Sequence, residues 1–299
     1  SLCKEEGANV MVTEFVSAEG VLQAWERNRR YVEFEESHRP LGVQVFGSNP
    51  EHLAEASRRI AEELHPDFLD LNAGCPVPKV VGKNGGSSLL RDLPLLQRAA
   101  GAMVRALEGL CPVTVKLRLG WDAEHVNAPE AVRRLEDVGV QALVIHGRTR
   151  AQQYGGSADW GMIDRCARLV SIPVIGNGDL ATPMQVKRAR EETAVAGVMI
   201  GRAAMHAPWI FRLAKHYLRT GEVLPEPPVE ERIALMLRHT RLALESGHYG
   251  AELPTMRAMR ARLLAYAKGI PGSKPLRPAL SRVASYAELE ALLKPLLPG

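Results

Sequence analysis

The sequence predicts an α/β fold, a (β/α)8 TIM barrel followed by a small C-terminal helical bundle. Three observations lead to this prediction. Short apolar runs rich in β-branched residues recur along the first two thirds of the chain, and amphipathic helical patterns separate them. The last third keeps only the helical periodicity. Apolar strands that alternate with amphipathic helices indicate parallel strands covered by helices, and eight such units close into a barrel.

Seven segments have the strand pattern: residues 9–14, 41–47, 68–74, 113–120, 142–148, 173–178 and 197–202. The helical pattern between them is clearest over residues 50–64, 93–107, 129–138 and 183–191. Ser48 or Asn49 is expected to cap the first of these helices, and Thr182, followed by Pro183, the last. Strand and helix therefore alternate as βα units require.

The start of the chain departs from this pattern. A βα barrel should begin with a strand, but SLCKEEGA looks like the end of a helix stopped by Gly7. We therefore expect a first strand and most of a first helix to lie upstream of Ser1. An open doubly wound sheet is the alternative fold. Such a sheet usually carries a glycine-rich nucleotide turn after its first strand, and no GxGxxG sequence occurs here.

The composition is that of a globular protein. Of 299 residues, 46% are hydrophobic and 24% charged, values that exclude a disordered or fibrous chain. No apolar run approaches the roughly 18 residues of a membrane span, and the start lacks a secretory signal, so we expect a cytoplasmic protein, and a monomer. The cysteines form no CxxC pair, which predicts free thiols and no structural metal site; they are Cys3, Cys75, Cys111 and Cys166.

The length predicts two domains, or one large barrel with an appendage. We assign residues 1–220 to a catalytic barrel domain, residues 221–231, rich in Pro and Glu, to a linker, and residues 232–299 to a helical domain. Helices are expected there over residues 232–245, 255–268 and 286–293.

Basic residues concentrate in the last third of the chain. Residues 1–205 carry 24 basic and 26 acidic side chains, whereas residues 206–299 carry 14 and 8. Such an excess is typical of a surface that binds polyphosphate, but a solvated helix face without a partner explains it about equally well. Between Leu253 and Ala287 there is no acidic residue and there are seven basic ones, namely Arg257, Arg260, Arg262, Lys268, Lys274, Arg277 and Arg282.

Glycine and polar residues follow the predicted strands, at the end where a βα barrel assembles its active site. The last two turns read Gly176-Asn177-Gly178 and Gly201-Arg202-Ala203. Glycine lets a backbone approach a ligand, and free N–H groups at helix starts favour phosphate. We expect a cofactor phosphate here, although the same glycines can simply make tight turns.

Lys116 lies within an otherwise apolar strand, where an uncompensated ammonium is costly to bury. It should therefore face an anion or an electron-rich ring, unless it pairs with a carboxylate on a neighbouring strand, such as Asp70. The amide of Gln44 is similarly placed and could recognise the edge of a heterocycle, although a hydrogen-bonded core glutamine is almost as good an explanation.

Two further groups of reactive side chains follow strands. His146, Arg148 and Arg150 come after the fifth segment and suit the binding of an anion or an electron-rich ring. Cys75 follows Asn72 by three residues, on a loop over the barrel mouth, where a thiol can act as a nucleophile or a proton donor. Cys111 and Cys166 stand away from the strand ends.

These segments resemble a known family, the tRNA-dihydrouridine synthases, which are FMN-dependent enzymes that reduce particular uridines in tRNA. The resemblance rests on LNAGCPVPKVVGKNGGSSLL, VKLRLGW, VIHGRTRAQQYGGSADW, PVIGNGDL and MIGRAAMHAPWIF, which occur in the family's order. It extends from about Leu2 to Ile210, is looser beyond, and is greatest to the bacterial B-type branch. The family's first-strand Pro-Met-Ala motif has no match here.

The resemblance implies a role for each matching residue. Cys75 would be the catalytic proton donor, and Asn72 and Arg148 would position the uracil. The basic helical region, represented by Arg257, Arg260, Lys268, Lys274 and Arg277, would bind tRNA. FMN would lie at the barrel mouth, with its ring system and its ribityl phosphate held by two groups of residues: Gln44, Lys116 and His146 for the ring, and Asn177, Gly178, Gly201 and Arg202 for the ribityl chain and phosphate.

The implied reaction uses NADPH to reduce FMN. The flavin then gives a hydride to carbon-6 of the uridine, and the thiol of Cys75 protonates carbon-5 from the opposite face. A stacked uridine must first be extruded, while the basic helical region holds the surrounding phosphates. Two alternatives remain open: an FMN barrel that reduces a free pyrimidine in the manner of dihydroorotate dehydrogenases, and a tRNA-binding folding aid without redox chemistry.

Overall fold

The computed structural model describes residues 2–296, and its internal contacts divide the chain into two units. The first unit comprises residues 8–201 and carries the strands. The second unit comprises residues 2–7 and the chain from Arg202 onward, and it is helical. No helix among residues 2–296 has the length and apolar character needed to span a bilayer.

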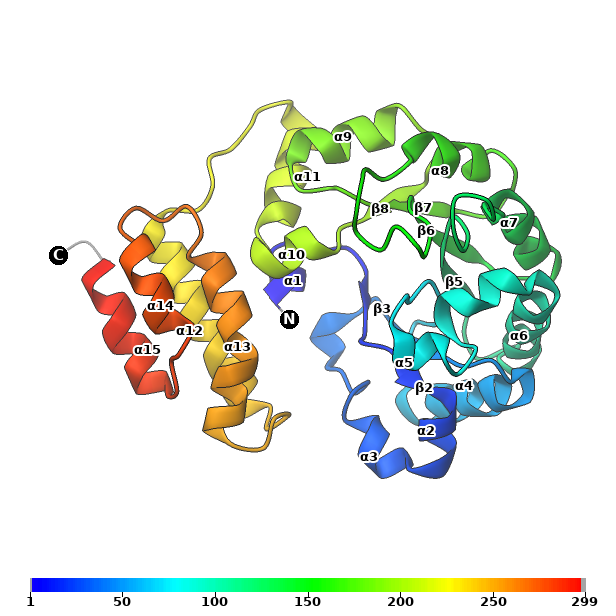
Figure 1. Cartoon of the computed structure of the whole chain (residues 1–299), viewed down its shortest axis with the longest axis horizontal. Coiled ribbons are helices and arrows are strands. Elements are labelled where there is room, and N and C mark those ends of the chain that lie inside the picture. The colour runs from blue at the N-terminus through cyan, green and yellow to red at the C-terminus, as the bar shows by residue number, and fades with distance from the viewer. Residues whose placement is uncertain (1, 297–299) are drawn as a thin grey trace. The chain divides into compact units, whose positions relative to one another are not determined.

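The first unit is built on a parallel sheet that curls into most of a barrel, with helices along its outside (Figure 1). All seven predicted strand segments are confirmed. Several strands are buried along almost their whole length, because the barrel interior covers one face and the helices cover the other. The strands are β1 (Met11–Val12), β2 (Val16–Ser17), β3 (Leu41–Phe46), β4 (Phe68–Ala73), β5 (Val113–Arg118), β6 (Ala142–His146), β7 (Val174–Asn177) and β8 (Gly197–Met199).

The first strand position is broken in two. Met11 of β1 lies opposite Leu41 and Val16 of β2 lies opposite Val45, so both short strands pair with β3. Within the described residues β8 pairs only with β7, and the sheet therefore has an open edge at β8 and another at β1 and β2. The βα barrel is thus present as seven strand positions of an unclosed cylinder.

The expected helix starts are confirmed where a cap can be recognised in the sequence. The side chain of Asn49 accepts hydrogen bonds from the N–H groups of Glu51 and His52, and Thr182 forms a capping box with Gln185. The helices of this unit are α2 (Ala18–Gln23), α3 (Trp25–Arg29), α4 (Pro50–Leu64), α5 (Pro78–Val81), α6 (Leu93–Ala106), α7 (Ala128–Asp137), α8 (Trp160–Ala167) and α9 (Pro183–Glu191), with 3-10 turns η1 (Glu36–His38) and η2 (Gly86–Arg91).

The core of the first unit lies between the strands and the outer helices. Leu53 and Ile60 of α4 and Met103 of α6 are fully buried there. They pack with the outward side chains of the strands, and this burial fixes the helices against the sheet. The strands' C-terminal ends and the loops that follow them are therefore held on a rigid frame.

The second unit has a hydrophobic core of its own, which includes Trp209, Met236 and Leu263. Arg232 is buried in it and donates to the carbonyls of Tyr266 (2.6 Å) and Lys268 (2.5 Å), so its charge caps the end of α13. Its helices are α1 (Leu2–Glu5), α10 (Arg202–His206), α11 (Ile210–Thr220), α12 (Val229–Glu245), α13 (Glu252–Tyr266), α14 (Arg277–Leu280) and α15 (Tyr286–Leu293), with η3 (Lys274–Leu276) and η4 (Lys294–Leu296).

The division by contacts falls after Gly201, whereas the sequence-based boundary stands at residue 220. The difference arises because Trp209 and Leu213 belong to the helical core rather than to the core of the sheet. The Pro/Glu segment has no helix over residues 222–228, and α12 begins at Val229, inside the predicted linker.

Gly176 provides a test of packing between β7 and α8. A Cβ atom at this position would lie 2.4 Å from the ring of Trp160, which is held in place because its Nε1 donates to the carbonyl of Gly178 (3.1 Å). Gly176→Ala should lower the free energy of unfolding by about 1–3 kcal/mol, measured by denaturant titration. Gly161→Ala on α8 is the matched control, since its nearest neighbour would be 3.4 Å away. Equal stability of the two variants would contradict this packing.

Candidate active site

Polar side chains from neighbouring strands meet at the C-terminal end of the sheet. The register places Asn72 of β4 opposite Lys116 of β5, and Arg118 opposite His146 of β6, which in turn lies opposite Asn177 of β7. Because the strands are parallel, all of these residues lie at one edge of the sheet. The structure thus brings together most of the residues expected at the barrel mouth.

A buried hydrogen-bonded chain crosses the floor of this site. The carboxylate of Asp70 accepts from the hydroxyl of Thr114 (2.5 Å) and from Nε2 of Gln44 (2.6 Å), while Oε1 of Gln44 accepts from Nδ2 of Asn72 (2.8 Å). Burial raises the pKa of Asp70, and the hydrogen bonds from Thr114 and Gln44 oppose that rise. The chain therefore fixes the orientation of both amide groups.

The same series of hydrogen bonds continues from Asn72 to the loop of Cys75. Oδ1 of Asn72 accepts from the backbone N–H groups of Gly74 (3.0 Å) and Cys75 (2.9 Å), and the carbonyl of Cys75 accepts from Oγ (2.9 Å) and from the backbone N–H (3.1 Å) of Ser87. A Cβ atom at Gly86, which has φ of +59°, would lie 2.8 Å from that carbonyl. The backbone of Cys75 is thus held from both sides. All four cysteines are free thiols, as predicted.

Lys116 is half-buried and has no carboxylate partner among the described residues. Its Nζ donates to Oδ1 of Asn177 (3.3 Å), and no acidic oxygen of residues 2–296 lies within 4.0 Å of it, so the alternative of an ion pair with Asp70 does not apply. Burial lowers the pKa of Lys116 to about 8, with Asp70 raising it and Arg118 lowering it further. The ammonium has one neutral acceptor, which leaves it suited to an electron-rich ligand.

The glycines after β7 and β8 have different surroundings. Gly178 has φ of +134°, and a Cβ atom there would lie 2.5 Å from Cβ of Ala158, so packing alone requires a glycine. A Cβ atom built at Gly201 would have Nδ2 of Asn177 as its nearest neighbour, at 3.9 Å. Space therefore remains beside this turn. Nδ2 of Asn177 donates to the carbonyl of Met199 (2.8 Å). Arg202 begins α10 and belongs to the second unit.

The surroundings of His146 favour the neutral form of its imidazole. Burial, together with the positive charges of Lys116, Arg118 and Arg148, lowers its pKa to about 3. One ring nitrogen, Nε2, lies 3.5 Å from a terminal nitrogen of Arg148. A neutral histidine can exchange hydrogen bonds with a ligand but is a poor proton donor at neutral pH.

Arg148 has most of its donors engaged by the protein. Its guanidinium forms a bidentate pair with Asp179 (2.9 and 2.8 Å) and also donates to the carbonyls of Gly155 (3.0 Å) and Gly156 (2.6 Å). The residue is only 1% exposed. This geometry holds the loop at residues 155–156 against the turn that follows β7, and it leaves no free donor edge toward a substrate.

Arg118 is a site residue that the sequence did not single out for a role. It donates to the carbonyls of Gly74 (2.9 Å), Thr149 (2.9 Å) and Gln153 (2.8 Å), and so ties the Cys75 loop to the turn after β6. The sequence feature that could have found it is an arginine two residues beyond the lysine in the same apolar strand segment. Its side chain points to the same face as Lys116, because side chains alternate along a strand.

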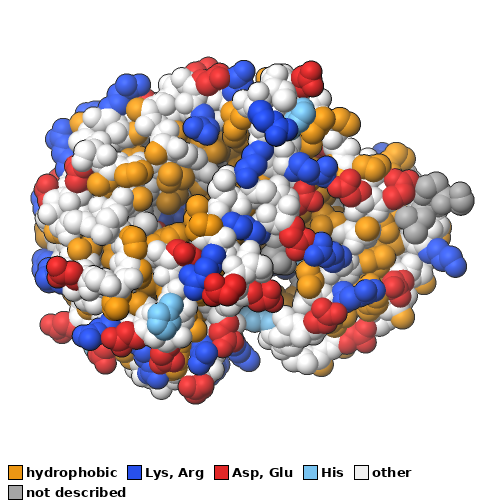
Figure 2. Space-filling view, turned by 180° about the vertical axis from the view of Figure 1, so that it is seen from behind, with side chains coloured by type: hydrophobic (Ala, Val, Ile, Leu, Met, Phe, Trp, Pro, Cys, Tyr) orange, Lys and Arg blue, Asp and Glu red, His pale blue; other side chains and the backbone are white. Residues whose placement is uncertain are grey.

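The basic residues of the second unit divide into two groups. Arg260 donates to the carbonyls of Arg282 (2.7 Å) and Val283 (2.9 Å), so its guanidinium helps to hold the helical fold together. On the face shown in Figure 2, Lys and Arg side chains are interspersed with Asp and Glu rather than gathered into one basic surface. Of the seven basic residues between Leu253 and Ala287, the exposed ones are Arg257, Lys268, Lys274, Arg277 and Arg282.

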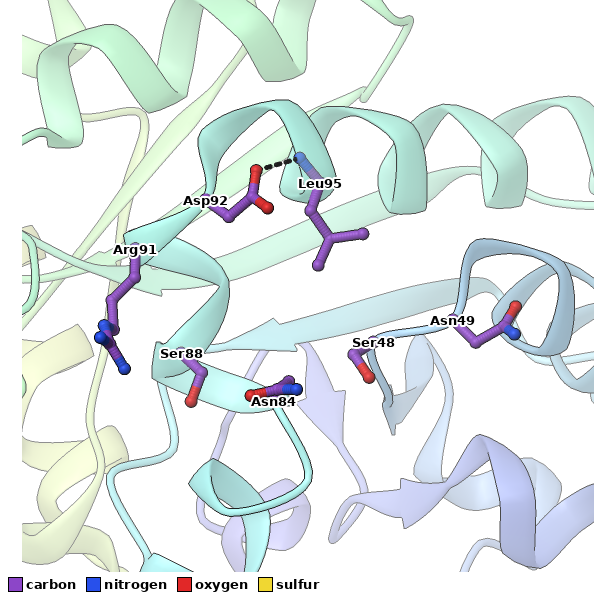
Figure 3. Close-up of a pocket in the computed structure, with 7 residues that line it drawn as sticks. All are labelled: Ser48, Asn49, Asn84, Ser88, Arg91, Asp92 and Leu95. Carbon is purple, nitrogen blue, oxygen red and sulfur yellow. Dashed lines mark hydrogen bonds between the residues drawn. The ribbon is translucent and has the colours of Figure 1, made fainter.

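A cleft of about 500 Å³ opens beside this site (Figure 3). It lies between the turn after β3 and the segment that follows the Cys75 loop, and none of Cys75, Lys116 and His146 lines it. Among residues 2–296 no group of three or more His, Cys, Asp or Glu side chains could hold a metal ion. The lining residues are Ser48, Asn49, Asn84, Ser88, Arg91, Asp92 and Leu95.

Comparison with known proteins relates the chain to one family. The family model described as dihydrouridine synthase matches residues 1–297. The chain is 39% identical over 282 residues to tRNA-dihydrouridine synthase B of Pseudomonas aeruginosa, covering 94% of this chain and 83% of that protein. It is 40% identical over 243 residues to tRNA-dihydrouridine synthase B of Escherichia coli (strain K12), covering 81% and 74%.

Solved structures share the fold at low sequence identity. Histamine dehydrogenase from Rhizobium sp. 4-9 has a TM-score of 0.54 and 13% identity, covering 73% of this chain and 42% of that one. A variant of NCR from Zymomonas mobilis has a TM-score of 0.52 and 13% identity, covering 77% and 81%. These similarities support the assignment of the sheet and its helices to a barrel-type α/β fold.

The lowered pKa of Lys116 predicts a pH-dependent stability. Its pKa is about 8 in the folded protein and about 10.4 in an unfolded chain. Between these values the unfolded chain binds a proton that the folded protein does not, so the free energy of unfolding rises with pH, by at most about 1.4 kcal/mol per pH unit. Lys116→Met removes this contribution.

Denaturant unfolding of the ligand-free protein checks the prediction. Lys116→Met should be more stable than the wild type at pH 7, and this difference should shrink between pH 8 and pH 10. A difference that stays constant with pH would show that no charged ammonium is buried at this position.

Proposed function

Because the chain belongs to the dihydrouridine synthase family, we propose that it reduces particular uridines of tRNA to 5,6-dihydrouridine, with FMN as cofactor and NADPH as reductant. The observation that carries this proposal is the family match over residues 1–297. The polar residues at the barrel mouth support it. Since its substrate is tRNA, we expect the protein to act in the cytoplasm.

The residues at the barrel mouth fit a flavin. Among residues 2–296 the ammonium of Lys116 has only the neutral Asn177 as an acceptor, and the electron-rich edge of an isoalloxazine ring would supply a further partner. The open space at Gly201, next to Asn177, suits the ribityl chain and phosphate, with Gly178 and Arg202 in the adjoining turns. When bound, the flavin would accept electrons from NADPH and supply a hydride to carbon-6 of the uridine.

Cys75 is the residue that we propose as proton donor to carbon-5. Its backbone is fixed by Asn72 on one side and by Ser87 on the other, which holds the thiol in a defined position. His146 also lies at the mouth, but its pKa of about 3 makes it unsuitable as an acid at neutral pH. We assign it instead to a hydrogen bond with the flavin ring.

Gln44 and Asn72 contribute recognition rather than proton transfer. Oε1 of Gln44 is occupied by Asn72, and one hydrogen of its Nε2 is occupied by Asp70, so its second N–H is the group left to bind a flavin or uracil carbonyl. We assign positioning of the uracil to Asn72 and to the loop of Cys75. Arg148 supports the site indirectly, through its pair with Asp179.

We assign tRNA binding to the exposed basic residues Arg257, Lys268, Lys274 and Arg277 of the second unit. Arg260 belongs to this region but acts by holding its fold. A uridine stacked in tRNA must leave its stack to reach a flavin inside the barrel mouth, and phosphate contacts around it offset that cost.

Replacement of Cys75 tests its role as proton donor. Cys75→Ala should keep FMN and tRNA binding but form dihydrouridine about 10²- to 10⁴-fold more slowly, because it lacks the proton source. Single-turnover oxidation of the pre-reduced enzyme by tRNA measures this rate. Cys111→Ser, a half-buried cysteine outside the site, is the control and should retain wild-type activity. Wild-type turnover by Cys75→Ala would refute the role.

The choice of oxidising substrate separates the proposal from the alternatives. NADPH-reduced protein should be reoxidised rapidly by tRNA lacking dihydrouridine and not by orotate, and the product tRNA should contain dihydrouridine. Rapid reoxidation by orotate would support an enzyme acting on a free pyrimidine. A colourless protein that binds tRNA without bound flavin would support a folding aid.

A further inference from the structure

Two arginines stack on one tryptophan at the rim of the barrel. The guanidinium carbon of Arg150 lies 4.5 Å from the ring centroid of Trp121, and that of Arg91 lies 4.9 Å from the same centroid. Both are cation–π contacts. This Arg91–Trp121–Arg150 stack combines residues from three different loops, which follow β4, β5 and β6.

The stack has a rigid support. The backbone N–H of Arg150 donates to the carbonyl of Gly120 (2.9 Å), and that of Ala151 donates to the carbonyl of Trp121 (2.8 Å). On the other side, Nδ2 of Asn127 donates to the carbonyl of Leu90 (2.7 Å), which joins η2 to the loop after β5. The three side chains are therefore mounted on segments that are bonded to one another.

The positive charge of the stack is not neutralised within the described chain. Neither guanidinium forms a hydrogen bond or an ion pair with residues 2–296, and Nε of Arg150 is buried without a partner. The adjacent carboxylates are engaged elsewhere, because Asp92 accepts from the N–H of Leu95 (2.9 Å) and Asp122 contacts Nδ1 of His125 (2.6 Å). On the outer helices, by contrast, the exposed Arg58 has Glu62 as a partner and Arg188 has Glu192.

The position of the stack relates it to the candidate active site. Arg91 ends η2, the same turn whose Ser87 holds the carbonyl of Cys75. Trp121 follows Arg118 by three residues, and Arg150 follows His146 by four. Arg91 also lines the cleft of about 500 Å³, where its side chain is drawn beside Ser88 and Asp92 (Figure 3).

We propose that the Arg91–Trp121–Arg150 stack is an RNA-binding surface of the first unit, which holds phosphates of the tRNA backbone next to the extruded uridine. This inference rests on the proposed function, since it assigns a further contact for the same substrate. An arginine stacked on an aromatic ring keeps its N–H edge free, and that edge matches the geometry of a phosphate. The ring contributes by holding both guanidinium groups against it.

The phosphate groups of NADPH offer the same chemistry as the RNA backbone. We favour RNA because two cations without an ion-pair partner among residues 2–296 stand on separate loops, and one of them, Arg91, lines a cleft outside the polar mouth, which suits a ligand that extends over the rim. The turns at Gly178 and Gly201, which suit a phosphate, follow β7 and β8, whereas the stack lies on the loops after β4, β5 and β6. The experiment distinguishes the two sources.

Charge-removing variants of the flavin-loaded protein test the proposal. Arg91→Gln and Arg150→Gln should each weaken tRNA binding about three- to tenfold and lower the slope of log Kd against log salt concentration by about 0.7–0.9, the loss expected for one phosphate contact. Trp121→Leu should weaken binding while changing that slope less, because it removes the support and keeps both charges. Arg58→Gln on the outer helix α4 is the matched control and should leave both quantities unchanged.

A second measurement separates this inference from the NADPH alternative and from the proposed function. The rate and KM of flavin reduction by NADPH should match the wild type in all four variants. Unchanged tRNA affinity and salt slope in both arginine variants would overturn the inference, as would a raised KM for NADPH with normal tRNA binding. The proposed function fails separately, if the wild type binds tRNA but forms no dihydrouridine.

Discussion

The buried carboxylate of Asp70 is the constraint on which the candidate site depends. It cannot be left without partners in the barrel interior, and it binds the hydroxyl of Thr114 and the amide of Gln44. Gln44 then fixes the amide of Asn72, and Asn72 fixes the backbone of Cys75. The position of the proposed proton donor is therefore set by a hydrogen-bonded chain that begins on the floor of the barrel.

Positive charge dominates the opposite part of the mouth. Lys116, Arg118 and Arg148 lie around His146 and hold its pKa far below its usual range, with burial as the larger cause. Arg118 and Arg148 are bound to backbone carbonyls and to Asp179, so their charge is fixed in place. Lys116 alone keeps an incompletely satisfied ammonium, which is why a ligand that carries electron density belongs there.

Much of the fold was predictable from local sequence. The strands were recognised by apolar runs, and α4 and α9 by their caps at Asn49 and Thr182, because such patterns need only neighbouring residues. The short helices α2, α3 and α8 were not predicted, since so few turns carry little periodicity. The boundary expected from the sequence, at residue 220, also differs from the division by contacts after Gly201. The reason is that no local sequence pattern shows that Trp209 and Leu213 pack in the helical core.

The sequence by itself determined the type of fold, the order of its strands and the candidate residues at their ends, because the periods of strand and helix and the position of a residue after a strand are local properties. Only the tertiary structure decided what each side chain contacts. It paired Arg148 with Asp179, left Lys116 without a carboxylate and stacked Arg91 and Arg150 on Trp121. These contacts join residues 29 to 61 positions apart, and they depend on how parallel strands bring separate loops to one edge of the sheet.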